Sequence, residues 1–583
     1  MIKNFQNFIR LINVTDTKKT YLIFLVFLML ISSFADILSL GLIIPYVTQI
    51  LNLQKNPDDF LPIDFNFLSY FPEENFIFLL TLLLIFIFFL KSLLSILIRW
   101  MISKFSFEQF AILQVKLLSV YQNMNYEDHI LRSSSDYIKN IRELCRECLN
   151  NIELTLKVLS EIIISFVIVV FLGFVNYKAL LLFFITFFPI YLIYEIFLKP
   201  INVKLGSTQT NALRATYNII DNSMRGFKET RILGKEAFFR NKLEKFAYIF
   251  YDTQKKSVLI TDSPRYVFEF FIILVSLLGI LYINKSSNLS SYLPLVSIYL
   301  VAAIRLLPGI SLIASSQSRI SLGQYAVTQI INDIDQLKNK NLKISNIRNK
   351  NEFSDEFESL KFKNVNFFYN NTGIEVFENL NFDLKKNDCI GLKGKSGEGK
   401  TTFVDIMLGL LTPQKGEIIV NDNLVDSFGS NFIGSIAYVP QEPVILDEKI
   451  STNIALETDE KKINYEKMQF AINQANLNEV VKNLPNKIET KIGDNGVRLS
   501  GGQNKRLALS RAFYHGKKII IIDEATSALD IKTENLIAEE IKNIKGKTTI
   551  IIISHSDNIL KYCDKVFLIE NKSISLLNKK NAD

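Results

Sequence analysis

Cysteine and histidine are scarce in this chain, with four Cys and three His among 583 residues. Cys145 and Cys148 form a lone CxxC pair without a neighbouring His, and Cys389 and Cys563 each stand alone. Zinc and thiol redox centres need several such residues at short, regular spacing. We therefore expect neither kind of centre.

Charged residues are also fewer than in an average soluble protein, at 21% against about 25%. Hydrophobic residues make up 49% of the chain and Phe occurs 46 times, and the mean hydropathy is +0.20. The net charge of +8 comes mostly from loops beside apolar runs, as in cytoplasmic loops of membrane proteins. The composition predicts a membrane protein and argues against nucleic-acid binding.

Six apolar segments approach the roughly 20 residues that cross a bilayer: 21–51, 76–98, 158–174, 179–198, 266–282 and 293–313. The segment 55–75 is acidic, with Lys55 as its single cation, whereas segments 99–157 and 199–265 are rich in Lys and Arg. By the positive-inside rule both termini are cytoplasmic. The first 51 residues do not resemble a cleaved signal peptide, because the apolar run is too long and no small-residue cleavage site follows.

The two basic segments are too polar to span a membrane and too long to be turns, so we expect membrane helices that continue beyond the bilayer and turn at their tips. The helical membrane domain is predicted over residues 1–332. Residues 333–358 are polar and rich in Lys and Asn, which predicts a linker. A second domain follows over residues 359–583, beginning near Ser359.

A glycine-rich loop in this second domain predicts a phosphate site. An apolar strand, Cys389 to Leu392, enters the loop, and an apolar helix over residues 402–411 follows it. Glycines let backbone N–H groups face a polyphosphate, and the helix N-terminus adds its positive end. The alternative is a plain turn before a helix. The loop residues are Gly394, Lys395, Ser396, Gly397, Glu398, Gly399, Lys400, Thr401 and Thr402. Lys400 would contact the outer phosphates and Thr401 would bind Mg²⁺.

Two acids, Asp523 and Glu524, follow an apolar strand at Ile519 to Ile522. Parallel sheets collect ligand-binding groups at the carboxyl ends of their strands, so these acids suit a metal and a reacting water. An ordinary solvated strand end is the alternative.

Further along, LSGGQ begins at Leu499 and opens a helix over residues 503–513. Combined with the glycine-rich loop, this sequence resembles the ATP-binding cassette (ABC) ATPases. The resemblance implies Mg²⁺ held by Asp523, Thr401 and Gln441, and water polarised by Glu524. It also implies an adenine-stacking aromatic at Tyr369, for which a plain strand aromatic is the rival, a switch histidine at His555, and a D-loop ending at Asp530. The signature residues Ser500, Gly501, Gly502 and Gln503 would face the ATP of a second copy.

With six spans before one cassette, the chain resembles a half-molecule of exporter-type ABC transporters. The implied fold is a polytopic α-helical membrane domain followed by an α/β P-loop nucleotide-binding domain, assembled as a homodimer. Two cytoplasmic tips, near residues 126–135 and 221–228, would contact the ATPase domains; solvated hairpins without that role are the alternative. ATP would close the dimer, and hydrolysis would release it.

The transported substrate is less constrained by the sequence. Ionisable residues within spans line cavities or pair with one another, so Lys91 and Arg305 would either meet an anionic head group or pair with Asp36, Glu161 and Glu269. Segments 34–48 and 305–308 look similar to bacterial flippases of lipid-linked oligosaccharides. This implies an amphipathic lipid-linked substrate and a bacterial inner-membrane location; an exporter of peptides or hydrophobic drugs is the main alternative, and an ATP-gated channel a lesser one. The aromatic loop 59–71 would contact a polyprenyl tail or merely anchor in the bilayer.

Overall fold

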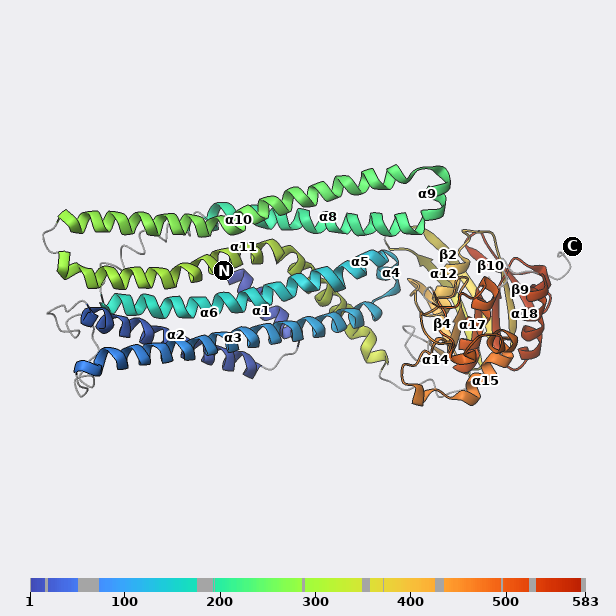
Figure 1. Ribbon diagram of the computed structural model, residues 1–583. Helices are drawn as coiled ribbons and strands as arrows, with labels where there is room; N and C mark the ends of the chain where they lie inside the picture. Colours follow the sequence, from blue (N-terminus) through green and yellow to red (C-terminus); the bar gives the residue numbers. More distant parts are fainter. Residues whose placement is uncertain are drawn as a thin grey trace. The chain divides into compact units, whose positions relative to one another are not determined.

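A computed structural model describes residues 2–15, 19–50, 73–175, 192, 194–285, 289–348, 357–370, 372–424, 435–493, 496–523 and 531–577. The chain forms two compact units. The first comprises Met1–Asn123 and Arg132–Lys338, and the second comprises Met124–Leu131 and Asn339–Asp583. Each is described separately, and Figure 1 labels their elements. The expected lipid-facing loop 59–71 lies outside the described residues.

The first unit is helical. Its helices are α1 (Ile2–Val14), α2 (Lys19–Ile50), α3 (Glu73–Gln122), α5 (Ser134–Lys139), η3 (Asn140–Leu144), α6 (Cys145–Val175), η4 (Tyr194–Leu198), α8 (Lys199–Arg225), α9 (Phe227–Leu233), α10 (Glu236–Lys285) and α11 (Leu289–Arg348). Helices α2, α3 and α6 pack on one another, and α8 lies beside α10 (Figure 1). Since α3 and α10 contain 50 residues each, each is about 75 Å long. That is more than twice the thickness of a bilayer core, so each helix is long enough to continue beyond a membrane, as predicted.

Three described helical segments are long and apolar enough to cross a membrane: Lys19–Ser39, Ile77–Gln122 and Ser134–Phe171. They contain most or all of the first three predicted spans. Most of the fourth predicted span, residues 179–198, lies outside the described residues. The fifth and sixth predicted spans lie within α10 and α11.

A glycine lets two of these helices meet closely. On α8, a Cβ atom added to Gly206 would lie only 1.9 Å from the carbonyl oxygen of Leu322 on α11. Close by, the Asn202 amide donates to Ser318 Oγ at 2.5 Å, and Thr261 Oγ1 lies 3.3 Å from the same hydroxyl. Buried polar side chains are costly unless hydrogen-bonded, so this cluster favours one relative placement of α8, α10 and α11.

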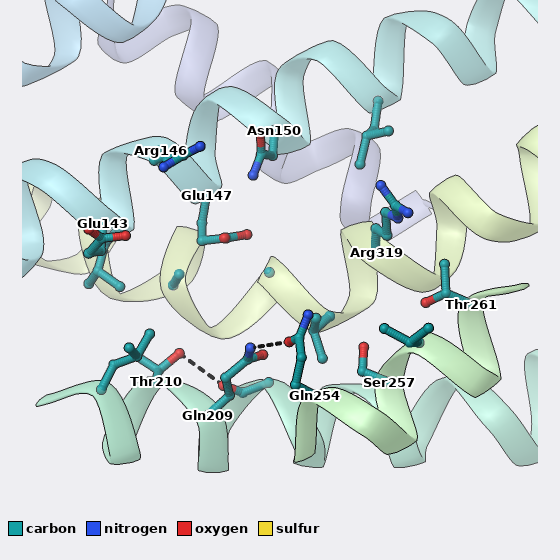
Figure 2. Close-up of a pocket in the computed structure, with 18 of the residues that line it drawn as sticks. Glu143, Arg146, Glu147, Asn150, Gln209, Thr210, Gln254, Ser257, Thr261 and Arg319 are labelled. Atoms are coloured by element: carbon teal, nitrogen blue, oxygen red, sulfur yellow. Dashed lines mark hydrogen bonds between the residues drawn. The ribbon is translucent and has the colours of Figure 1, made fainter. Parts of the chain in front are cut away.

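A cavity of about 620 Å³ opens among η3, α6, α8, α10 and α11, and both polar and apolar side chains line it (Figure 2). Gln209 donates to Gln254 across it at 2.6 Å. Its charged lining residues are Glu143, Arg146, Glu147, Glu153, Lys157, Asp262 and Arg319. Cavities of 300 to 1,000 Å³ are the usual size of small-molecule sites, so this one has room for a ligand.

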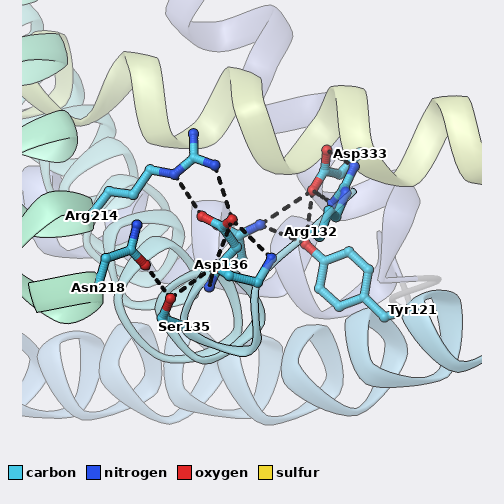
Figure 3. Close-up of polar contacts among 9 residues, drawn as sticks. Tyr121, Arg132, Ser135, Asp136, Arg214, Asn218 and Asp333 are labelled. Carbon is cyan, nitrogen blue, oxygen red and sulfur yellow. Dashed lines mark hydrogen bonds and ion pairs between the residues drawn. The ribbon is translucent and has the colours of Figure 1, made fainter. Parts of the chain in front are cut away.

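Within the predicted linker over residues 333–358, α11 remains helical as far as Arg348, and the division between the two units falls at Lys338 and Asn339. Asp333 is only 9% exposed. Its Oδ2 accepts hydrogen bonds from Tyr121 Oη at 2.8 Å and Arg132 Nη1 at 2.9 Å, and Asn140 Nδ2 lies 3.3 Å away (Figure 3). No Gly or Pro occurs between Gly323 and Gly373. Part of the polar segment that predicts a linker therefore belongs to a helix, and its Asp333 is anchored by hydrogen bonds.

The second unit contains two sheets. Strands β1 (Ser359–Phe368), β2 (Glu375–Lys385), β4 (Lys415–Val420) and β5 (Asn423–Leu424) form an antiparallel sheet in the order β2-β1-β4-β5. The other sheet has the order β10-β9-β3-β8-β7-β6. Its strands are β3 (Cys389–Lys393), β6 (Ile436–Val439), β7 (Ile519–Asp523), β8 (Thr549–Ile553), β9 (Lys565–Glu570) and β10 (Ser573–Leu576). All except β10 are parallel to their neighbours.

Aromatic packing joins the antiparallel sheet to helix α12 (Lys400–Met407). The Phe403 ring lies 5.7 Å from that of Phe362 and 5.1 Å from that of Phe382, with edge-to-face geometry in both pairs. Such pairs contribute about 0.5–1.5 kcal/mol beyond their buried area. They hold the helix that follows the glycine-rich loop against the core.

Candidate functional site

Parallel strands bring the predicted catalytic residues to one edge of the larger sheet. Neighbouring strands run in the order β3-β8-β7-β6. The glycine-rich loop follows β3, His555 follows β8, Asp523 ends β7 and Gln441 follows β6. Because the strands are parallel, these positions share the carboxyl edge of the sheet, where α/β folds bind ligands. Four segments separated by up to about 160 residues therefore converge.

The glycine-rich loop wraps around Lys400, the first residue of α12. Lys400 Nζ donates to the carbonyl oxygens of Gly394 at 2.6 Å and Lys395 at 3.2 Å, and it lies 3.2 Å from Nε2 of His555. Thus the two side chains predicted to contact the outer phosphates adjoin each other. Thr401 is exposed beside them, at a helix N-terminus that favours anions.

Gly399 is required by the shape of this loop. Its φ is +95°, and an added Cβ would lie 2.7 Å from Val376 Cγ1 and 3.1 Å from the Phe377 ring. Only glycine combines such a backbone with this close approach at low cost. The loop residues Lys395, Ser396 and Gly397 are exposed.

Tyr369, the predicted adenine-stacking residue, follows β1 and is half-buried. Its ring meets that of Phe367 edge-to-face at 5.1 Å, and its hydroxyl lies 3.0 Å from Thr402 Oγ1 on α12. These contacts fix the ring beside the glycine-rich loop. They agree with packing as a strand aromatic, and adenine stacking stays a prediction.

Asp523 occupies the predicted metal position at the end of β7. Tyr438 on β6 donates its hydroxyl to Asp523 Oδ2 at 2.9 Å. Asp405 on α12 is 7% exposed; burial first, and the charge of Asp523 second, raise the pKa of Asp405 to about 7. Burial and then the Asp523 charge likewise raise the pKa of Tyr438. Sequence reasoning missed both neighbours, although an acid inside the apolar run 402–411 was a usable signal.

The predicted magnesium ligands supply a carboxylate from Asp523, a hydroxyl from Thr401 and an amide oxygen from Gln441. These are hard oxygen donors, and Mg²⁺ prefers one or two carboxylates together with substrate phosphates. Asp523, at the end of β7 on the same edge of the sheet as the glycine-rich loop, therefore fits this ion. Glu524 and Asp530, the predicted water-polarising residue and the D-loop acid, lie outside the described residues.

The LSGGQ segment forms a capped helix start. Ser500 Oγ accepts the backbone N–H of Gln503 at 3.3 Å, and Gln503 Oε1 accepts that of Ser500 at 2.8 Å. This capping box begins α17 (Gly501–Tyr514). Gly501 has no neighbouring atom within 4 Å of an added Cβ, so the helix N-terminus is accessible to an anion, as the signature motif predicts.

An arginine on α17 links the signature helix to the segment after Gln441, a feature that sequence reasoning did not find. Arg511 donates to the carbonyl oxygens of Asn453 at 2.6 Å and Val444 at 2.8 Å. Asn453 in turn binds the loop carbonyls of Leu446 and Glu448. The network gives the two motif-bearing segments a common support.

Helix α4 (Tyr126–Ile130) belongs to the second unit although its neighbours in sequence belong to the first. Tyr126 packs against the aromatic core of the antiparallel sheet, and Glu127 Oε2 accepts the side-chain amide of Asn370 at 2.9 Å. The first part of the predicted tip 126–135 therefore packs within the second unit. At the other predicted tip, α9 exposes Phe227, Ile232 and Leu233.

Within the helical unit, Lys91 forms an ion pair with Asp36, which is 1% exposed. Glu161 lies 3.9 Å from Arg99, and Glu269 lies 3.1 Å from Arg265. The structure thus shows Lys91 in an ion pair, which is the second of the two roles predicted for it. The side chain of Arg305 lies outside the described residues. Lys91 is not among the residues that line the cavity of Figure 2.

Residues 377–527 match the family model described as ABC transporter. An ATP-dependent lipid A-core flippase of Ralstonia nicotianae is 34% identical over 217 residues, covering 37% of each chain. A protein of the same name from Cupriavidus metallidurans is 27% identical over 61% of this chain and 60% of its own length. The leukotoxin translocation ATP-binding protein LktB of a Pasteurella haemolytica-like species is 31% identical over 38% of this chain and 31% of its own. The matches thus span about a third to three fifths of these relatives.

A solved structure of a bacterial Atm1-family ABC exporter with ATP bound superposes with a TM-score of 0.79. The match covers 96% of this chain and 94% of that one at 17% identity. At this identity the likeness concerns the fold, which is shared over both the helical and the sheet-containing units.

Proposed function

We propose that this chain, an ABC exporter half-molecule with a C-terminal ABC transporter domain, is an ATP-driven translocase of the membrane. The observation that carries the proposal is the shared edge of β3, β8, β7 and β6. There Lys400 and His555 adjoin each other and Asp523 ends the neighbouring strand. Phosphoryl transfer needs such positioning and charge neutralisation more than covalent chemistry.

In the proposed reaction Lys400 and the loop N–H groups hold the outer phosphates of ATP. Thr401, Gln441 and Asp523 would hold Mg²⁺, which supplies neutralisation of the phosphate charge. Glu524 orients the attacking water, and His555 contacts the γ-phosphate. Tyr369 stacks on adenine. The capped N-terminus at Ser500, with Asp530, completes the site of a second copy, because one domain cannot present both helix N-termini to one γ-phosphate.

The proposed working unit is therefore a homodimer with two shared sites, lying in a bacterial inner membrane with both termini in the cytoplasm. ATP favours the closed dimer and its hydrolysis favours the open one, and this difference in affinity drives the change of access. Helix α4, which contacts Asn370 and the aromatic core, would transmit the change.

For the substrate we propose a lipid-linked oligosaccharide or a similar amphipathic glycolipid, moved from the inner to the outer leaflet. Two relatives are named lipid A-core flippases. The cavity of Figure 2 supports a polar head group, because amides, hydroxyls and charges of both signs line it. The leukotoxin-transporting relative keeps peptide export as the second candidate.

Glu524→Gln tests the ATPase assignment in the full-length protein. It should lower hydrolysis by about 10²–10⁴-fold, leave ATP binding intact, and accumulate an ATP-dependent closed dimer on crosslinking. Glu539→Gln, which makes the same change at an exposed position of α18 (Ile531–Ile544), is the matched control and should retain full turnover. Undiminished hydrolysis by Glu524→Gln would contradict the role of Glu524.

The substrate is tested by transport in proteoliposomes. ATP-dependent movement of a fluorescent polyprenyl-pyrophosphate glycan or a lipid A-core glycolipid, abolished by Glu524→Gln, is the expected result. Efflux of peptides or hydrophobic dyes without glycolipid movement would favour the second candidate.

A further inference from the structure

The polar surroundings of Asp523 extend beyond the predicted metal ligands. Tyr438 lies on β6 opposite Ile521 of β7 in the parallel register, two residues before the end of that strand. Its hydroxyl reaches Asp523 Oδ2 at 2.9 Å. A hydrogen bond to one oxygen restricts rotation of the carboxylate, which is how surrounding donors orient metal ligands.

Asp405 is the second member of the cluster. It lies on α12, five residues after Lys400, with only 7% of its surface exposed. The charge of Asp523 raises the pKa of Asp405, after burial, and Asp405 in turn raises the pKa of Tyr438. Asp405, Asp523 and Tyr438 thus lie near enough to influence one another's charge, within the same compact unit.

Tyr126 of α4 also belongs to this cluster. Burial, then the charge of Asp405, then Tyr369 raise the pKa of Tyr126, and Tyr126 also raises that of Tyr438. Its ring packs on the core beside α12, and the neighbouring Glu127 bonds to Asn370. A movement of α4 would therefore act on the core that includes apolar residues of α12, the helix that carries Asp405.

We propose that Tyr438 is a positioning residue for the Asp523 carboxylate, and that Asp405 and Tyr126 connect this contact to helix α4. The proposal rests on the ATPase function proposed above and deepens it. Through this cluster the helix that joins the membrane domain to the cassette adjusts how firmly Asp523 is oriented, and hence the affinity for Mg²⁺ with ATP. Residues on α4, α12 and β6 act on one carboxylate of β7.

The experiment uses the full-length protein and follows metal binding rather than turnover. ATP affinity is titrated with Mg²⁺, and bound Mn²⁺ is observed by electron paramagnetic resonance. Tyr438→Phe keeps the ring and removes the donor. We expect the Mg²⁺ concentration that gives half of the gain in ATP affinity to rise by about 10-fold or more. ATP affinity in EDTA should stay within about twofold of the wild type, because the hydroxyl acts on the metal ligand alone.

Tyr514→Phe is the matched control. Tyr514 on α17 also uses its hydroxyl, which accepts the N–H of Asn464 at 3.0 Å, and it lies outside the cluster. This variant should keep the wild-type Mg²⁺ dependence. An unchanged Mg²⁺ dependence in Tyr438→Phe would overturn the proposal, and so would an equal loss of ATP affinity with and without Mg²⁺, which would indicate a general structural role.

The link to α4 is tested by a double-mutant cycle of Tyr126→Phe and Tyr438→Phe. Coupled residues should give a combined shift in the Mg²⁺ midpoint that departs from the product of the single shifts by at least about threefold. Multiplicative shifts would remove Tyr126 from the cluster. Wild-type hydrolysis on the same preparation separates the two proposals: if it is intact while Tyr438→Phe behaves as wild type, only the positioning role fails.

Discussion

Replacing Asp405 by Asn should stabilise the nucleotide-free protein, and more so at alkaline pH. Burial and the Asp523 charge raise the pKa of Asp405 from 3.8 to about 7. An acid with a raised pKa in the folded state binds its proton more tightly there than in the unfolded chain. Stability is therefore lost as pH rises from about 4 to about 7, and the loss is complete above that range. Asn cannot ionise and escapes this loss.

The magnitude follows from the shift. At pH 8 the unfavourable contribution corresponds to about three pKa units, or about 4 kcal/mol at 1.36 kcal/mol per unit. Solvent screening reduces this to about 2 kcal/mol. Between pH 5 and pH 8 the advantage of Asn should grow by about 1.4 kcal/mol on the same scale. For a domain of this size each kcal/mol moves the melting temperature by about 2–4 °C, which predicts a gain of about 3–6 °C.

The assay is thermal unfolding of the full-length protein in detergent with EDTA, comparing Asp405→Asn with the wild type at pH 5 and pH 8. Asp383→Asn, an exposed acid on β2, removes the same charge where water solvates it and should leave the pH dependence unchanged. Adding Mg²⁺ and ATP should shrink the gain, since a cation beside Asp523 offsets the repulsion. A melting difference that is equal at both pH values would refute the reasoning.

Two further substitutions test the geometry of each unit. Gly399→Ala should abolish measurable ATP binding, because its φ of +95° and the 2.7 Å approach to Val376 Cγ1 both oppose a Cβ; ATP affinity near that of the wild type would contradict this account of the loop. Asp333→Ala should lower the free energy of unfolding by about 2–3 kcal/mol, because it strips Arg132 and Tyr121 of their acceptor. The exposed pair of Asp221 with Arg225 provides the control, since Asp221→Ala should cost less than about 1 kcal/mol, and equal losses would show that the Asp333 cluster contributes little.

Local patterns in the sequence were sufficient to predict the elements that carry the nucleotide site. The apolar run before the glycine-rich loop is β3, and the run before Asp523 is β7. Both runs are short and apolar, and the glycine-rich loop or the acids that follow them favour a buried strand over a longer helix. The helix after LSGGQ begins where its Ser and Gln predict a cap.

The predicted linker shows what composition leaves open. Residues 333–348 are polar in sequence, yet they continue a helix whose Asp333 is anchored by Arg132, Tyr121 and Asn140. Those partners lie about 190 to 210 residues earlier in the chain. Local composition contains no information about such distant partners.

The sequence by itself determined that a P-loop, an acidic strand end and an LSGGQ helix start are present, together with apolar segments long enough to cross a membrane, because each depends on residues close together in the chain. Only the tertiary structure decided that Tyr438 bonds to Asp523, that Asp405 is buried near it, and that α4 packs with the cassette. Hydrogen bonding and desolvation at these positions depend on which distant segments become neighbours, and folding alone sets that.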